Sequence, residues 1–147
     1  MLASVTQKAV RMLDWLAGRL LPPDTRPEHQ CVGQCGEEDA YFYLRKLGYV
    51  MVARNFRSPR RRGEIDLIGW DGNILCFIEV KTRTTHDVKP AEAAVDREKL
   101  HDLAGVAREY LRELRSTPEW RFDVVSVYYE KHLFQPQFEL FKNSCPM

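Results

Sequence analysis

The sequence predicts an α/β fold in which helices flank a mixed central β-sheet. A helical pattern comes first, and three strand patterns, a long second helix and further strands follow it in the order αβββαβ. Two of the strand patterns are joined by the turn residues Asp71-Gly72-Asn73, which predicts an antiparallel hairpin. Acidic residues stand at the ends of these strand patterns.

Five stretches rich in apolar and β-branched residues predict the strands. Residues 37–47 predict the first helix, with Gly48 at its end. The second helix is expected to begin at Pro90 and to end before Pro118. The predicted strands cover residues 49–56, 63–70, 74–80, 120–129 and 134–141.

Residues 1–30 differ in character from residues 31–147, which we expect to form one domain. Apolar side chains at helical spacing predict an N-terminal amphipathic helix, and three prolines end it in a polar linker. Two interpretations are open: the helix packs on its own domain, or it docks a partner or a second subunit in a homodimer. The apolar positions are Val5, Ala9, Met12, Leu13, Leu16 and Leu20.

Composition limits the class of protein. The chain has 147 residues, enough for one buried core, and its 22 basic and 21 acidic residues nearly cancel. No apolar run approaches the ~20 residues that span a bilayer. Cys76 lies inside an apolar strand pattern, where a free thiol behaves as a small apolar side chain, and this favours a reducing, cytoplasmic location.

Two carboxylates and a lysine carry the functional prediction. Asp66 lies in the first strand of the hairpin, and Glu79-Val80-Lys81 ends the second. Because side chains alternate along a strand, Glu79 and Lys81 share one face. A carboxylate at the end of an apolar strand needs a partner, so that either Glu79 pairs with Lys81 alone, or the acids hold a divalent cation, Mg²⁺ or Mn²⁺.

A basic loop leads into the first strand of the hairpin. Residues 45–62 include seven basic residues and no acidic one, and Arg60-Arg61-Arg62 ends this segment. Such a run is either solvated surface or, beside a metal site, a phosphate-binding track that Arg57, Arg83 and Arg97 extend. The sequence shows no base-reading motif, so we expect recognition of nucleic-acid shape.

Five motifs occur in order between residues 33 and 143. They are Gly33-Gln34-Cys35-Gly36-Glu37-Glu38-Asp39-Ala40, Arg54-Asn55-Phe56-Arg57, Gly63-Glu64-Ile65-Asp66-Leu67-Ile68, Phe77-Ile78-Glu79-Val80-Lys81-Thr82-Arg83 and Arg121-Phe122-Asp123-Val124-Val125. Together they resemble the YraN-like family of bacterial proteins, in the PD-(D/E)xK nuclease superfamily, which is similar in core to archaeal Holliday-junction resolvases. The resemblance implies a restriction-endonuclease-like core, although Ile65 stands where the superfamily signature has a proline.

The resemblance also implies roles for four residues. Glu37, Asp66, Glu79 and Lys81 match its catalytic positions, and the three acids, with the backbone carbonyl of Val80, are the expected metal ligands. Lys81 is expected to orient the attacking water or to stabilise charge in the transition state, and a nearby cation would favour its deprotonated form.

Two further residues, Lys99 and Glu64, have other expected roles. Lys99 lies on the face of the second helix that can approach the strand ends, and we expect it to contact nucleic acid. We interpret Glu64 chiefly as a strand-entry or pairing residue.

The sequence therefore predicts a Mg²⁺-dependent endonuclease-like protein that hydrolyses phosphodiesters in DNA, including branched or damaged DNA. One alternative is a nucleic-acid-binding module that keeps the fold and the metal but does not cut. A second alternative is a module that binds another protein through its basic loop and N-terminal helix. The clustered acids and Lys81 favour the enzyme, because a binding module has little need for them.

Overall fold

A mixed five-stranded sheet forms the centre of the protein, as the sequence predicts. The computed structural model describes residues 9, 28–83, 97–130 and 134–144. The strands lie in the order β1-β2-β3-β4-β5, and only the pair β3–β4 is parallel. Their bounds are β1 Val50–Phe56, β2 Ile65–Asp71, β3 Ile74–Arg83, β4 Trp120–Tyr128 and β5 Gln137–Phe141.

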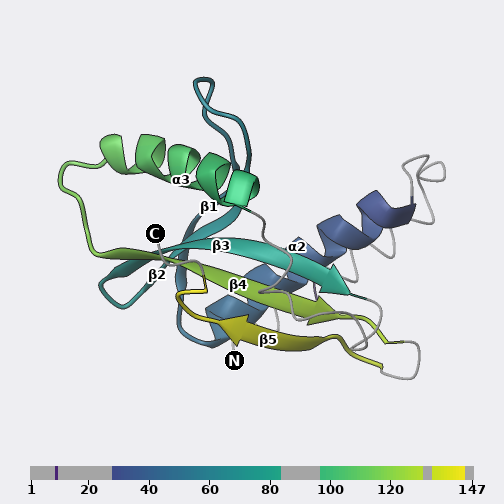
Figure 1. The fold of residues 1–147 in the computed structure, drawn as a ribbon. Helices are drawn as coiled ribbons and strands as arrows, with labels where there is room; N and C mark the ends of the chain where they lie inside the picture. Colours follow the sequence, from purple (N-terminus) through teal and green to yellow (C-terminus); the bar gives the residue numbers. More distant parts are fainter. Residues whose placement is uncertain (1–8, 10–27, 84–96, 131–133, 145–147) are drawn as a thin grey trace.

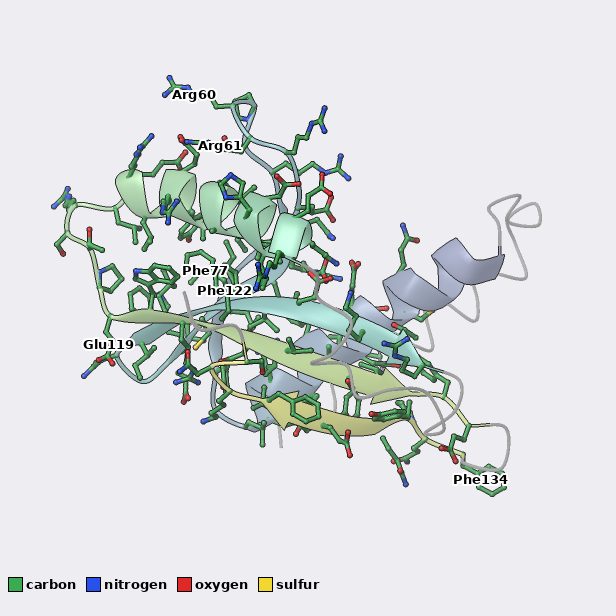
Figure 2. The ribbon with its side chains drawn as sticks, in the orientation of Figure 1. Arg60, Arg61, Phe77, Glu119, Phe122 and Phe134 are labelled. Carbon is green, nitrogen blue, oxygen red and sulfur yellow. The ribbon has the colours of Figure 1, made fainter. Side chains whose placement is uncertain are left out.

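Two helices cover opposite faces of this sheet (Figure 1). Helix α3, Arg97–Arg112, packs on the face that carries Phe77 and Phe122, whose ring centroids are 5.6 Å apart (Figure 2). Helix α2, Glu28–Lys46, packs on the other face. Because side chains alternate across the strands, each face of the sheet builds its own apolar core, and the layers follow an α/β/α order.

Helix α2 begins nine residues before its predicted start at Glu37. The additional turns contain two glycines, which discourage a helix prediction because glycine is unfavourable in a helix interior. A Cβ atom at Gly36 would lie 2.1 Å from Oγ1 of Thr82 on β3, whereas a Cβ at Gly33 would meet nothing within 4 Å. Gly36 therefore lets the helix pass close to β3 just before Glu37.

The turn between β2 and β3 has two residues, because Asp71 pairs with Ile74. Gly72 within it has a φ of 61°, which glycine adopts at little cost. Arg121 fixes the turn by donating hydrogen bonds to Asp71 at 2.6 Å and to the fully buried Asp123 at 2.8 Å. Arg121 and Asp123 belong to the fifth sequence motif. Because their ion network lies at the hairpin end of the sheet, this motif has a structural role.

Some predictions fall on other parts of the chain. Residues 1–27, apart from residue 9, and the expected helix start at Pro90 lie outside the described residues. The predicted domain boundary after residue 30 falls within α2, which begins at Glu28, and the division into two parts stays a prediction. Strand β5 begins at Gln137 rather than at residue 134, where the Phe134 side chain is exposed. Within the described part of the chain, no helix has both the length and the apolar character needed to cross a membrane.

Candidate functional site

The candidate site lies at the ends of β2 and β3 that are opposite to the hairpin turn. The described pairing of these strands ends at Leu67 and Ile78. One residue further on, the carboxylate of Asp66 accepts a 2.8 Å hydrogen bond from the backbone N–H of Val80. The Asp66 carboxylate thus accepts a hydrogen bond from a backbone N–H at the point where the pairing of β2 with β3 has stopped. This bond holds the Asp66 side chain beside Glu79.

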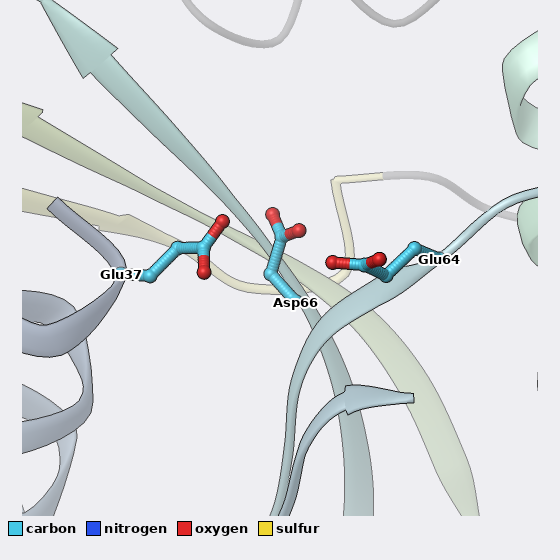
Figure 3. A group of neighbouring side chains, drawn as sticks. All are labelled: Glu37, Glu64 and Asp66. Carbon is cyan, nitrogen blue, oxygen red and sulfur yellow. The ribbon is translucent and has the colours of Figure 1, made fainter. Parts of the chain in front are cut away.

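Three carboxylates from two parts of the chain converge here (Figure 3). Glu37 comes from α2, Glu64 from the segment before β2, and Asp66 from β2 itself. One carboxylate oxygen from each lies within 4.8 Å of the other two. Oxygen ligands of this kind suit Mg²⁺ or Mn²⁺, so the donor set fits the divalent cation that the sequence predicts.

Asn55 links two of these acids. Its side-chain nitrogen Nδ2 donates hydrogen bonds to Glu37 at 2.9 Å and to Glu64 at 2.8 Å. Asn55 has a φ of 48°, a left-handed conformation that asparagine adopts more readily than most residues. Arg57 also donates to Glu64, so the segment 55–57 holds this acid in place.

A second group of charges surrounds Glu79. Lys81 Nζ lies 3.0 Å from Oε1 of Glu79, and Lys99 from α3 donates a hydrogen bond to the same oxygen. The shared face of Glu79 and Lys81 and the approach of Lys99 to the strand ends are therefore confirmed. The two lysines offset the charge of a buried carboxylate that would otherwise be costly.

Burial changes the protonation of this site. Burial, together with the charge of Glu79, raises the pKa of Asp66 to about 8. Burial also lowers the pKa of Lys81, and the hydrogen bond and charge of Lys99 act in the same direction. Burial alone would lower the pKa of Lys99 as well, but its hydrogen bond to Glu79 raises it. The pKa of Lys81 is thus lowered and that of Lys99 is raised. The sequence prediction relies on a nearby metal cation to favour deprotonated Lys81, whereas burial is the main cause of the lowered pKa here.

The predicted basic track has a mixed arrangement. The loop between β1 and β2 carries Arg60 and Arg61 alongside α3, where Arg61 lies against Gly105 (Figure 2). Arg60 and Arg62 are exposed, whereas Arg61 lies 3.7 Å from Glu109 of α3. Together with His101, Asp102 and Gly105, the three arginines line a small surface pocket.

The other predicted nucleic-acid contacts differ in their surroundings. Arg57 pairs with Glu64 inside the candidate site, and Lys99 pairs with Glu79. Arg83 ends β3 opposite Tyr128 of β4, and Arg97 is the exposed first residue of α3. Contact of these residues with nucleic acid stays a prediction.

Of the four predicted catalytic residues, Glu37 and Asp66 share one carboxylate cluster, whereas Glu79 lies outside that cluster and contacts Lys81 and Lys99. Two further residues, Glu64 and Asn55, belong to the site. Glu64 is a pairing residue, as predicted, with Arg57 as its partner, and its carboxylate also joins Glu37 and Asp66. Strand alternation already places Glu64 and Asp66 on one face, which is the signal that could have found it. Asn55 belongs to the second of the five motifs, but its role could not be predicted from the sequence, because it depends on α2 lying beside β1.

The fold and this cluster define the class of protein: a mixed α/β domain with carboxylates and lysines gathered at the ends of two sheet strands. The model of the uncharacterised protein family UPF0102 matches residues 36–127. The chain belongs to this family, which agrees with the YraN-like resemblance.

The relatives differ in how much of the chain they match. A UPF0102 protein of Koribacter versatilis (strain Ellin345) is 52% identical over 139 residues, which cover 95% of this chain and 93% of the relative. A UPF0102 protein of Solibacter usitatus (strain Ellin6076) is 50% identical over 65% of this chain and 73% of its own length. One from Herminiimonas arsenicoxydans is 40% identical over 69% of this chain and 81% of its own length.

Proposed function

We propose that this protein is a metal-dependent nuclease that hydrolyses phosphodiester bonds in DNA. The convergence of Glu37, Glu64 and Asp66 within 4.8 Å carries the proposal. Gathering like charges in a partly buried place costs free energy, and a divalent cation at the centre offsets that cost. The implied membership in the PD-(D/E)xK superfamily supports the same function.

Glu37, Glu64 and Asp66 would hold the Mg²⁺ or Mn²⁺ ion, with Glu79 and the carbonyl of Val80 as further predicted ligands. A bound divalent cation offers charge stabilisation to the phosphoryl group and makes a water molecule a better nucleophile near neutral pH. Asn55 is a suitable support for Glu37 and Glu64, because it donates to both and brings no charge that competes with the cation.

Basic side chains of the protein would supply the other functions that the reaction needs. Lys81 sits beside Glu79 with a lowered pKa, which makes both of its protonation states accessible. The neutral amine would orient the attacking water, and the ammonium form would stabilise negative charge on the phosphoryl oxygens. Lys99 holds Glu79 from the other side and acts as a positioning residue. The exposed Arg60 and Arg62 are suited to phosphate contacts beyond the site.

One observation favours a second function, a nucleic-acid-binding module that does not cut. Glu79 is held by two lysines, so part of the site's negative charge is already offset by the protein. A cluster that is balanced in this way can persist in a protein that only binds. The cleavage experiment below separates the two functions.

The test is incubation of the purified protein with linear, flapped and four-way-junction DNA, in Mg²⁺, in Mn²⁺ and in chelator. We expect cleavage with either metal and none with chelator. Asp66→Asn should remove the activity, whereas Glu119→Gln, which changes an exposed carboxylate remote from the site, should keep it (Figure 2). Binding without cleavage by the wild type would favour the binding module.

A further inference from the structure

Two arginines lie over one tyrosine ring beside the candidate site. The guanidinium carbon of Arg54, on β1, is 5.2 Å from the ring centroid of Tyr41, and that of Arg45, on α2, is 5.8 Å from it. Both arginines are exposed, while Tyr41 is half-buried. The ring attracts each cation and restricts where the two side chains can go.

This arginine pair has no acidic partner among the described residues. In contrast, several arginines elsewhere form ion pairs: Arg57 with Glu64, Arg112 with Glu109, and Arg121 with Asp71 and Asp123. Two like charges held over one ring repel each other, and an anion that both can reach removes this repulsion. Guanidinium groups bind phosphate with paired hydrogen bonds, so a phosphate group suits the arrangement.

The pair is adjacent to the acid cluster along two routes. On β1, Arg54 directly precedes Asn55, which donates to Glu37. On α2, Glu37, Tyr41 and Arg45 follow at intervals of four residues, so they share one face of the helix. At 1.5 Å per residue, Arg45 lies about 12 Å along the helix from Glu37. That length equals about three to four nucleotides of one strand of B-DNA.

We infer that Arg45 and Arg54, held by Tyr41, form a phosphate clamp for the backbone of the DNA substrate, about three to four nucleotides from the scissile bond. The inference rests on the proposed function and adds a binding site to it. The clamp lies on the α2 side of the acids, whereas the Arg60-Arg61-Arg62 loop lies by α3. The substrate backbone would then extend from the acids in two directions, with basic residues on each side.

The test measures binding of a fluorescently labelled DNA duplex in chelator at a series of salt concentrations. The Arg45→Ala/Arg54→Ala double variant should bind more weakly, and its salt slope should fall by about 0.9 for each phosphate that the protein no longer neutralises. The matched control is Arg108→Ala/Arg115→Ala, which removes the same charge from exposed positions on and after α3. We expect this control to keep most of the wild-type slope.

Substitutions of Tyr41 provide a second comparison of DNA binding. Tyr41→Phe keeps the aromatic face and should bind DNA as the wild type does, whereas Tyr41→Leu should weaken binding, because it no longer holds the guanidinium groups. Wild-type slopes in the Arg45→Ala/Arg54→Ala variant, or equal reductions in the variant and its control, would overturn the clamp. Because the binding is measured without metal, a protein that cuts no DNA can still show the clamp, so the two proposals fail separately.

Discussion

The backbone N–H of Val80 donates a 2.8 Å hydrogen bond to Oδ2 of Asp66. Val80 stands between Glu79 and Lys81, so this bond fixes the acid of β2 against the residue pair of β3. The bond occurs one residue after the strands stop pairing, where a backbone donor would otherwise need another partner. The convergence of the two strand ends therefore follows from where the hairpin pairing stops.

Asp66 should make the metal-free protein less stable as the pH rises. Its pKa is raised by burial and by Glu79 from 3.8 to about 8, so between these values the folded state keeps a proton that the unfolded chain has lost. The contribution of the bound proton to folding stability is full below the unfolded pKa of 3.8. It is lost as the pH rises through the folded pKa of about 8. In chelator, urea unfolding should therefore show Asp66→Asn gaining stability over the wild type between about pH 5 and about pH 8. If the difference in unfolding free energy between Asp66→Asn and the wild type does not change with pH, the pKa of Asp66 is not raised in the folded protein.

Much of the fold could be predicted from the sequence because its signals are local. The hairpin at Gly72 depends on turn residues and alternating strands, and both are visible in the sequence. The start of α2 at Glu28 could not be predicted in this way, since Gly36 is favourable only when Thr82 of β3 lies against it. That contact joins residues far apart in the chain.

Some contacts of the candidate site could also be predicted from the sequence, and others could not. Glu79 and Lys81 are two residues apart on one strand, so alternation alone predicts that they meet. The bonds from Asn55 to Glu37 and Glu64 bring together three separate segments, and only the packing of α2 beside β1 creates them. Residues that support a site from other elements leave little trace in a single sequence.

Asn55 should strengthen metal binding by holding Glu37 and Glu64 together. Asn55→Ala and Asn55→Gly both remove the two hydrogen bonds, so each should weaken Mg²⁺ binding in calorimetry, and we expect about a 10-fold to 100-fold loss. Glycine tolerates the φ of 48°, so Asn55→Gly should unfold at nearly the same urea concentration as the wild type.

Asn143 offers the control for Asn55, because it has a similar φ of 53° and lies after β5. Asn143→Gly should leave Mg²⁺ affinity unchanged. If Asn55→Gly binds Mg²⁺ as tightly as the wild type, the asparagine serves the backbone conformation alone.

Gly36→Ala should destabilise the fold, because the added Cβ meets Oγ1 of Thr82 at 2.1 Å. Overpacking of this kind costs about 1–3 kcal/mol, which urea unfolding measures. Adding Thr82→Ala should recover part of the loss, whereas Thr82→Ser keeps the oxygen and should not. Gly33→Ala is the control, since its Cβ meets nothing within 4 Å, and it should stabilise α2 by about 0.5–1 kcal/mol.

Lys81 should matter more for the rate of cleavage than for binding. An ammonium group offers no lone pair to a cation, so Lys81→Ala should bind Mg²⁺ and DNA nearly as the wild type does. Its cleavage rate in single turnovers should fall by about 10²–10³, the effect of removing one electrostatic stabiliser. Lys99→Ala, which removes the other lysine on Glu79, should cost less. Equal losses in the two variants would contradict their separate roles.

Metal binding and DNA cleavage can be compared in the same preparation of wild-type protein and Asp66→Asn. We expect the wild type to bind Mg²⁺ in calorimetry and to cut at least one of the linear, flapped or four-way-junction DNAs, and we expect chelator to stop the reaction. Asp66→Asn should lose both properties while it stays folded. A wild type that binds no divalent cation and cuts none of these DNAs would contradict the proposed nuclease, and so would equal cleavage by the variant.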